Sequence, residues 1–210
     1  MKADYVWLNG ELMPFKQANV PFLSPTMHYG LGVFEGIRCY ETSGGAAVFR
    51  LSEHLQRLLD SALIFGIRDF PYTLQELREA TLETIRANGF NSCYIRPLIY
   101  LDGPLGLNLD AAESRIGIAT WEWGAYLGEE ALETGVHMMV SSFTRHHINA
   151  SMTKAKISGN YVNSVLAKTL ALRSGYDEAI MLDSEGKVRE AAGENIFVVK
   201  GNKVKTPEYS

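Results

Sequence analysis

The sequence has few of the features that mark secreted, membrane or nucleic-acid-binding proteins. Only two cysteines occur, Cys39 and Cys93, and their spacing is not that of a metal site. No apolar run approaches the ~18 residues of a membrane helix, and the first ten residues lack the apolar core of a signal peptide. Basic residues do not predominate: 20 Lys and Arg stand against 24 Asp and Glu, a formal net charge of −4. We therefore expect no metal, nucleic-acid or membrane partner, and a reducing, cytoplasmic location.

The composition is otherwise that of an ordinary globular protein. The 210 residues are 46% hydrophobic and 21% charged, and no internal repeat or low-complexity tract is visible. This length suits one large domain or two small ones. Dinucleotide-binding, P-loop and nucleophile-elbow motifs are absent.

Local patterns predict blocks of strands and helices. Asn9-Gly10 is typical of a hairpin turn, Thr73-Leu-Gln-Glu76 is a helix capping box, and Asn88-Gly89 is a helix stop signal. We expect strands at 5–8, 11–13, 32–41, 47–50, 92–101, 115–121, 136–142, 178–183, 187–190 and 195–200. Helices are expected from a cap at Ser52, over 74–88 and over 160–174.

Helical periodicity also predicts which side chains are buried. The first helix would bury Leu55, Leu58, Leu59, Ala62 and Leu63, and the second Leu74, Leu77, Thr81 and Ile85. Pro97 predicts an edge strand or a bulge, because proline cannot donate to a strand ladder. The mixture favours an α+β fold with a largely antiparallel sheet in each half and a hinge at 124–130.

Several residues have side chains suited to catalysis, each with an ordinary alternative. Lys154 and Lys156 precede a helix start, where positive potential favours a neutral amine, the form that Schiff-base chemistry requires; both also suit a solvated surface. Arg57 suits a phosphate, but Glu53 and Asp60 on the same helix also allow a surface ion pair.

Other candidates lie on predicted strands. Tyr94 and Arg96 share one face and suit a carboxylate, or belong to a solvated edge. Glu190 ends a strand, where it either faces a cationic heterocycle or water. Trp121, Trp123 and Tyr126 form either a pocket wall or core packing, which is the default for aromatic residues. His54 is expected to be structural, and His146 and His147 form no metal site.

Six segments together resemble one family. They are residues 28–38 (HYGLGVFEGIR), 49–58 (FRLSEHLQRL), 94–98 (YIRPL), 121–128 (WEWGAYLG), 156–164 (KISGNYVNS) and 190–197 (EAAGENIF). Their order along the chain is similar to that of fold-type IV pyridoxal-phosphate enzymes, and of branched-chain amino acid aminotransferases in particular. The resemblance implies a two-domain α+β fold: a small N-terminal domain at 1–122, a linker at 123–134, and the first part of a large cofactor domain at 135–210.

The resemblance also implies an activity. The protein would transfer the amino group between L-leucine, L-isoleucine or L-valine and 2-oxoglutarate by a ping-pong mechanism with pyridoxal 5′-phosphate. Its partners would be these amino acids, their 2-oxo acids, glutamate and a second copy of the chain, in a homodimer or a higher homo-oligomer. The alternatives are a D-amino acid or (R)-amine transaminase of the same fold, and a non-catalytic, truncated dimerisation or cofactor-binding fragment.

Residue roles follow from the resemblance in the same way. Lys156 would be the Schiff-base lysine, and Lys154 would have no role. Arg57 would hold the cofactor phosphate, Tyr161 the ring's phenolate oxygen and Glu190 the pyridine nitrogen. Substrate contacts are implied for Tyr29, Phe34, Gly36, Tyr94, Arg96, Leu107, Trp123 and Tyr126, with Tyr29 and Leu107 reaching the partner's site. Members of the family continue beyond Ser210 with two further phosphate-binding turns, so we expect this sequence to lack part of the second domain.

Overall fold

The chain forms two compact units in a computed structural model that describes residues 3–124, 126–128 and 130–208. Unit 1 comprises the chain up to Trp123 together with Ala155–Gly159, and unit 2 comprises Gly124–Lys154 and the chain from Asn160 onward. The change from unit 1 to unit 2 falls at the start of the predicted hinge, of which residues 125 and 129 lie outside the described part. Periodicity gave no sign that the short segment 155–159 belongs with the N-terminal unit.

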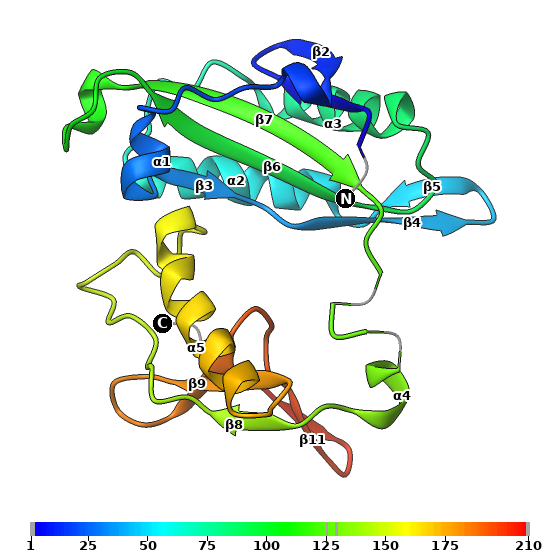
Figure 1. Cartoon of the computed structure of the whole chain (residues 1–210). Coiled ribbons are helices and arrows are strands. Elements are labelled where there is room, and N and C mark those ends of the chain that lie inside the picture. The colour runs from blue at the N-terminus through cyan, green and yellow to red at the C-terminus, as the bar shows by residue number, and fades with distance from the viewer. Residues whose placement is uncertain (1–2, 125, 129, 209–210) are drawn as a thin grey trace. The chain divides into compact units, whose positions relative to one another are not determined.

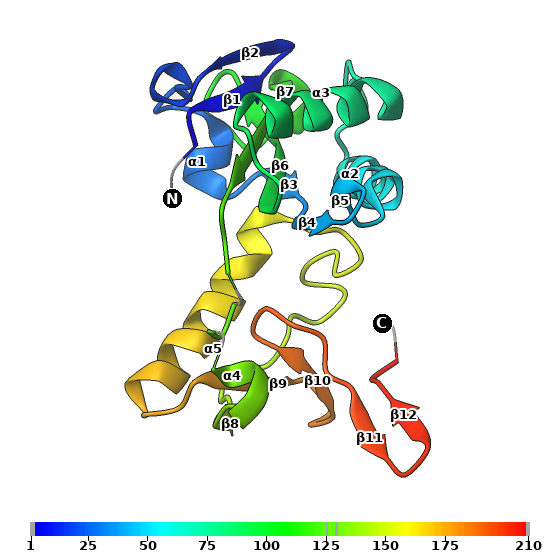
Figure 2. The ribbon, with the colours of Figure 1, turned by 90° about the vertical axis from the view of Figure 1, so that its right-hand side faces the viewer.

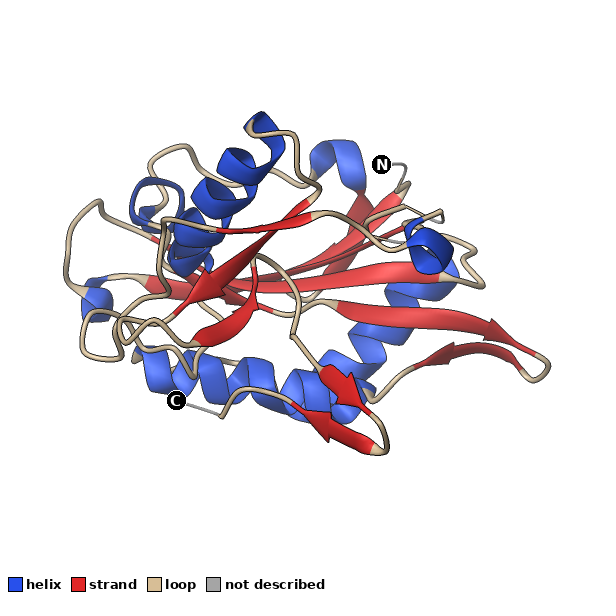
Figure 3. Cartoon of the chain, turned by 90° about the horizontal axis from the view of Figure 1, so that it is seen from below, coloured by secondary structure: helices blue, strands red, loops and turns tan. Residues whose placement is uncertain are grey.

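Unit 1 is built on a seven-stranded sheet in which every pairing is antiparallel (Figures 1 and 3). The strand order is β2-β1-β7-β6-β4-β5, and β3 also pairs with β6. The strands are β1 (Tyr5–Leu8), β2 (Glu11–Pro14), β3 (Gly32–Phe34), β4 (Ile37–Thr42), β5 (Gly45–Val48), β6 (Cys93–Asp102) and β7 (Glu113–Trp121). The predicted first hairpin is confirmed, with Asn9 and Gly10 both at positive φ as its tight turn requires.

The predicted single strand over 32–41 is two strands, because the chain leaves the ladder at Glu35 and Gly36. Pro97 lies opposite this interruption, where its carbonyl accepts the Glu35 amide at 3.0 Å. Strand β6 is therefore not at an edge: β7 flanks one side, and β3 and β4 flank the other. An interior strand tolerates proline here because the missing amide faces the one place where the neighbouring ladder is broken.

Two helices cover one face of this sheet, α2 (Leu51–Phe65) and α3 (Leu74–Ala87), while the short α1 (Pro25–Tyr29) packs on β6 (Figures 1 and 2). The capping box of α3 is confirmed, with reciprocal bonds between Thr73 and Glu76. The predicted cap of α2 is wrong: the helix begins at Leu51 after Arg50, which adopts a left-handed conformation and makes no side-chain cap.

The core of unit 1 lies between these helices and the sheet. Leu55, Leu58, Leu77 and Ile95 are fully buried in it. The predicted burial of Leu63 is wrong, since 66% of it is exposed. The buried face of α2 includes Ser61 instead, and the hydroxyl of Ser61 accepts a hydrogen bond from the Lys156 amide.

Unit 2 contains a three-stranded sheet and one long helix. The sheet order is β10-β9-β8, formed by β8 (Met138–Val140), β9 (Glu178–Leu182) and β10 (Val188–Ala191). Strands β8 and β9 are parallel, so within this sheet the expectation of antiparallel pairing holds only for β9 and β10. Helix α5 (Tyr161–Arg173) packs on β9 through Ala167 and Ala171 (Figure 2). The remaining elements are α4 (Ala131–Thr134), the hairpin of β11 (Val198–Lys200) and β12 (Lys203–Lys205), and the short helices η1 (Phe15–Gln17), η2 (Leu109–Ala111) and η3 (Ser158–Asn160).

Within the described ranges, no helix is long and apolar enough to cross a membrane.

Candidate active site

A fully buried carboxylate, Glu35, lies in unit 1 at the break between β3 and β4. Arg57 binds it bidentately, with Nε 2.5 Å from Oε1 and Nη2 2.7 Å from Oε2. His54 Nδ1 lies 2.9 Å from the same Oε2. A buried carboxylate requires such partners, because desolvation of an unpaired charge is costly.

This arrangement argues against one of the two interpretations of Arg57, the surface ion pair on its own helix. Glu53, the predicted surface partner, pairs with Arg50 at 2.8 Å, and Asp60 accepts a hydrogen bond from Gln56. The guanidinium of Arg57 is therefore turned toward the sheet, although 55% of its side chain stays exposed. Glu35 holds it in a fixed orientation while leaving it accessible, which suits the binding of an external anion.

The segment 155–159 carries Lys156 and is tied to the same helix and strand. The Lys156 amide donates to Ser61 Oγ at 3.1 Å, and its carbonyl accepts the Phe34 amide at 3.0 Å. The amine Nζ lies 5.1 Å from the centre of the Phe34 ring. Since His54, Arg57 and Ser61 recur at helical spacing on α2, one helix face positions both the guanidinium and the lysine backbone.

Two glycines allow this segment to approach α1. A Cβ on Gly30 would lie only 2.7 Å from the Gly159 Cα, and Gly30 has φ +69°, so a side chain is excluded on both grounds. The Gly159 amide donates to the Gly30 carbonyl at 3.1 Å. Lys154, by contrast, is exposed, as expected for a lysine with no role.

Tyr94 and Arg96 lie beside Phe34 on the sheet. Arg96 Nη2 donates to the Tyr94 hydroxyl at 2.9 Å, and its guanidinium carbon lies 4.6 Å from the Phe34 ring centre. Because β6 is interior and both side chains are half-buried, the alternative of a solvated edge is wrong. A Cβ on Gly36 would lie 2.2 Å from the Tyr94 hydroxyl, so the position admits only glycine while Tyr94 keeps this place.

Arg96 also has an unused donor: its Nε is buried and has no hydrogen-bond partner among the described residues. Such a donor is costly to bury alone, and a bound carboxylate would satisfy it. Trp123 packs on Tyr94 with ring centres 4.6 Å apart, and its carbonyl accepts a hydrogen bond from Arg38 at 2.7 Å. Trp121 stacks on Trp123, so this aromatic group is packed together and also half-open to solvent.

In unit 2, Glu190 is paired with Arg145, with Nε 2.5 Å from Oε1. Arg145 Nη1 also donates to Asn163 at 3.0 Å and to Ser164 at 3.3 Å, both in the first turns of α5. Glu190 therefore does not simply face water. Arg145 was not among the predicted residues, because it lies in an irregular segment after β8 where no periodicity or motif marks it.

The other predicted residues of unit 2 lie at the start of α5 and before α4. Tyr161 is the first residue of α5 and is half-buried. Tyr126 lies near Gly193, where a Cβ would be 3.4 Å from the tyrosine hydroxyl. In unit 1, the two residues implied to reach a partner are exposed, Tyr29 to 42% and Leu107 to 87%.

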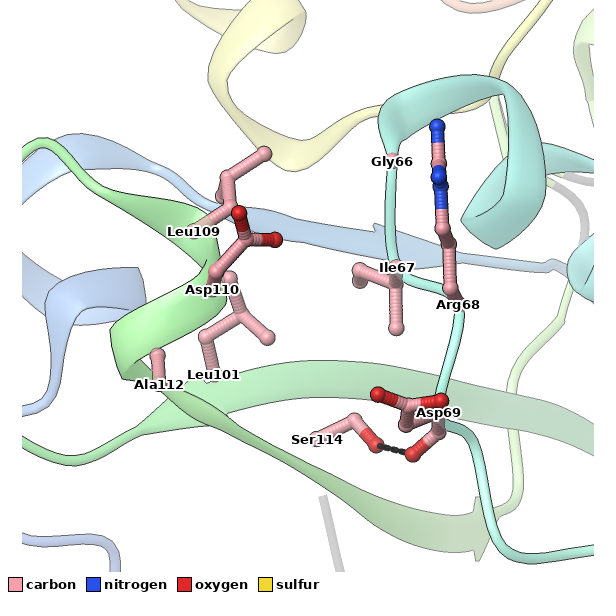
Figure 4. Close-up of a pocket in the computed structure, with 9 residues that line it drawn as sticks. All are labelled: Gly66, Ile67, Arg68, Asp69, Leu101, Leu109, Asp110, Ala112 and Ser114. Atoms are coloured by element: carbon pink, nitrogen blue, oxygen red, sulfur yellow. Dashed lines mark hydrogen bonds between the residues drawn. The ribbon is translucent and has the colours of Figure 1, made fainter.

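A pocket of about 220 Å³ lies elsewhere in unit 1 and has a different lining (Figure 4). It is lined by Gly66, Ile67, Arg68, Asp69, Leu101, Leu109, Asp110, Ala112 and Ser114. Ser114 donates to the Asp69 carbonyl at 2.9 Å across its rim (Figure 4). None of the predicted site residues lines it, so the candidate site rests on the side-chain geometry described above.

Each unit, taken by itself, presents side chains that suit a part of pyridoxal 5′-phosphate. Unit 1 supplies an amine that can bond an aldehyde and an oriented guanidinium for a phosphate. Unit 2 supplies a carboxylate braced by an arginine, which suits a pyridine nitrogen, and a tyrosine hydroxyl.

Comparison with known proteins identifies the class. The amino-transferase class IV family matches residues 32–210, and the chain therefore belongs to the class IV aminotransferases. The branched-chain-amino-acid aminotransferase of Pseudomonas aeruginosa is 48% identical over 206 residues, which are 98% of this chain and 67% of that protein. At this identity the chain belongs to the branched-chain-amino-acid aminotransferase family.

Solved structures agree with this assignment. The Escherichia coli branched-chain amino acid aminotransferase has a TM-score of 0.95 at 47% identity, over 98% of this chain and 68% of that one. The T.th. enzyme with pyridoxamine 5′-phosphate has a TM-score of 0.94 at 46% identity, over 100% of this chain and 69% of that one. The same enzyme complexed with N-(5′-phosphopyridoxyl)-L-glutamate has a TM-score of 0.93 at 42% identity, over 100% of this chain and 68% of that one. The chain thus spans about two thirds of the length of these relatives.

Proposed function

We propose that this aminotransferase transfers the amino group between L-leucine, L-isoleucine or L-valine and 2-oxoglutarate, in two half-reactions with pyridoxal 5′-phosphate. Family membership supports the branched-chain amino acids and the cofactor. The glutamate adduct of the T.th. enzyme supports glutamate as the second amino acid.

One observation carries the substrate assignment: the buried, unused Nε of Arg96 beside the ring of Phe34. An apolar ring suits a branched aliphatic side chain, and a guanidinium within reach suits the second carboxylate of glutamate. Leucine has an aliphatic side chain, whereas glutamate has a second carboxylate. The same side-chain pocket must therefore accept both. Tyr94, Gly36, Trp123 and Tyr126 are proposed to complete the contacts to the amino acid.

Roles toward the cofactor are proposed for single residues, each on the geometry of its own unit. Arg57 would bind its phosphate, Tyr161 its ring oxygen and Glu190 its pyridine nitrogen. When bound, pyridoxal 5′-phosphate supplies an aldehyde for the amino group and a ring that accepts electrons from the substrate α-carbon. Glu35 keeps Arg57 oriented, and Arg145 keeps Glu190 in place, before any ligand arrives.

Lys156 is proposed as the catalytic residue. Its amine would hold the cofactor at rest and would then act as the base and acid that moves a proton between the amino acid Cα and the cofactor C4′. Bonds from its amide to Ser61 and from its carbonyl to the Phe34 amide hold the backbone, so only the flexible side chain has to move.

We propose a homodimer as the working state. Tyr29 and Leu107 are exposed, and so are the apolar side chains of Phe22, Leu23 and Met27 in and before α1. Several exposed apolar side chains in one short stretch of chain are consistent with an interface. Tyr29 and Leu107 would contact the substrate of the partner subunit.

A reducing, cytoplasmic location is proposed from the cysteines. Cys39 and Cys93 are partners across β4 and β6, both are buried, and both are free thiols. Two adjacent buried thiols suit a reducing compartment.

The test combines turnover with chemical trapping. The protein with pyridoxal 5′-phosphate is expected to form glutamate from L-leucine and 2-oxoglutarate and to be inactive on D-alanine and (R)-1-phenylethylamine. Borohydride reduction followed by peptide mapping should place the cofactor on Lys156. Lys156→Ala should abolish turnover and trapping, whereas the matched Lys154→Ala should change neither. Activity on D-alanine but not L-leucine would overturn the substrate assignment, and a cofactor-free Lys156 would overturn the mechanism.

A further inference from the structure

A second buried carboxylate lies in unit 2, at the first residue of β9. Glu178 is fully buried; its Oε2 accepts Lys168 Nζ at 2.6 Å and its Oε1 accepts the Ala179 amide at 2.7 Å. Lys168 also donates to the Asp177 carbonyl at 2.7 Å. Glu178 is thus paired with one lysine, and each of its two oxygens accepts a hydrogen bond.

Glu194 is a further acid next to Glu178, and no ion pair is formed by Glu194 among the described residues. Its Oε2 accepts the Gly193 amide at 3.1 Å, whereas its Oε1 is buried and has no donor among the described residues. The carboxyl of Glu178 lies within hydrogen-bonding reach. Burial and the charge of Glu178 raise the pKa of Glu194, and the Gly193 amide and Lys168 oppose this only in part.

A single proton would remove the repulsion between the two carboxylates of Glu178 and Glu194. Two adjacent buried carboxylates repel each other, but one proton between them forms an O–H···O bond and satisfies the orphaned oxygen. Because Lys168 pairs with Glu178, a proton held by the two acids is favoured on Glu194, whose pKa is raised. The charged and titratable groups that face this carboxyl are Glu178 from β9, Lys168 from α5 and Tyr126 from the segment before α4.

The acid pair is in contact with elements that the proposed reaction uses. Glu194 closes the turn 191–194, where its carbonyl accepts the Ala191 amide at 2.8 Å, directly after Glu190. Lys168 Nζ lies 5.3 Å from the centre of the Tyr126 ring, a cation–π distance. The Tyr126 hydroxyl lies against Gly193 in the same turn.

We propose that Glu194 is a positioning residue: its protonated carboxyl donates to Glu178 and thereby fixes the turn 191–194 against the ring of Tyr126. The inference rests on the proposed function, in which Tyr126 contacts the substrate side chain. Below the raised pKa of Glu194 the pair is joined by the proton and the ring is held. As the pH rises through that pKa the proton is lost, the carboxylates repel, and the side-chain pocket loosens.

The test uses 4-methylvalerate, an analogue of leucine without the amino group, because its carboxyl group is ionised throughout above about pH 6 and the ligand has no other titrating group. Its Kd for the cofactor-loaded protein, measured by calorimetry, should rise with pH by about fivefold, the loss expected for one hydrogen bond. In Glu194→Gln the amide donates at every pH, so the Kd should stay low throughout. In Glu194→Ala it should be high throughout, with the KM for L-leucine raised and kcat little changed. Glu185→Gln, at an exposed turn, should match the wild type at every pH.

The outcomes separate this inference from the function on which it rests. If the wild type binds 4-methylvalerate but Glu194→Gln keeps the wild-type pH dependence, or Glu194→Ala binds as the wild type does, the positioning role is overturned and the function stands. If the wild type neither binds 4-methylvalerate nor converts L-leucine, both are overturned. Circular dichroism of each variant identifies any loss of fold, and the isosteric Glu194→Gln keeps the test decisive if Glu194→Ala unfolds.

Discussion

Arg145 Nε lies 2.5 Å from Glu190 Oε1, and its Nη1 donates to the first turns of α5. The guanidinium thus connects the end of β10 to the start of the helix that carries Tyr161. Glu190 and Tyr161 are the two residues of unit 2 proposed to hold the cofactor ring. Arg145 touches neither the ring nor the substrate in this proposal, so it acts by fixing the residues that do.

Arg145→Met should therefore weaken cofactor binding by about tenfold, since a hydrogen bond to a charged group contributes roughly 1.5–3 kcal/mol. Glu190 would keep its charge but lose its fixed orientation. Titration of the apoprotein with pyridoxal 5′-phosphate, followed by absorbance, measures the effect. Arg173→Met, at the exposed end of α5, is the matched control. Equal affinity of Arg145→Met and the control would contradict the role.

The pair of Glu35 and Arg57 is asymmetric, because Glu35 is fully buried while Arg57 is 55% exposed. Arg57→Met should cost about 2–3 kcal/mol of unfolding free energy, since it leaves a buried carboxylate with His54 as its remaining side-chain partner. Glu35→Gln should cost less, because water can solvate the released guanidinium. Denaturant unfolding measures both.

The double variant Glu35→Gln/Arg57→Met provides the check on this explanation. With the buried charge removed, it should be more stable than Arg57→Met alone. Both Arg57 variants should still bind the cofactor weakly, because the phosphate contact is lost in each. A double variant no more stable than Arg57→Met would show that the buried charge is not the source of the cost.

Gly36 lies between β3 and β4. A Cβ at this position would be only 2.2 Å from the Tyr94 hydroxyl. Gly36→Ala should force Tyr94 to move and cost about 1–3 kcal/mol of stability, as overpacking does. The KM for L-leucine should rise more than kcat falls, because Tyr94 is proposed to bind the substrate. Gly44→Ala, where the nearest atom is 3.8 Å away, should leave both unchanged. A normal KM in Gly36→Ala would remove Tyr94 from the substrate site.

Local signals predicted the fold better than they predicted the contacts that build the site. The capping box at Thr73 and the Asn9-Gly10 turn are determined by neighbours in sequence, and both are confirmed. The pairing of Arg57 with Glu35 spans 22 residues, and periodicity alone favoured the nearby Glu53 instead. Pairings of this kind depend on where the sheet places each residue. A local sequence pattern does not give that position.

The same reason explains two further differences. Pro97 predicted an edge strand or a bulge, but its compatibility with an interior strand depends on the break at Glu35 in a distant segment. Lys156 was placed by the motif it resembles, whereas its attachment to Ser61 and Phe34 follows from the return of 155–159 to unit 1. The candidate residues came from the resemblance to a family. The structure identified three further residues of interest, Arg145, Glu35 and Glu194.

The cysteines provide a last prediction that is independent of catalysis. Burial, together with the neighbouring Cys39, raises the pKa of Cys93 to about 12, and burial also raises that of Cys39. Only the thiolate reacts with disulfide reagents, so neither cysteine should react with Ellman's reagent in the native protein at about pH 8. Both should react once the protein is unfolded in guanidinium chloride, which serves as the internal control. Fast reaction of one thiol in the native state would mean that the end of β6 opens readily, and the pairing of Cys39 with Cys93 across β4 and β6 would then be only a minor part of the ensemble.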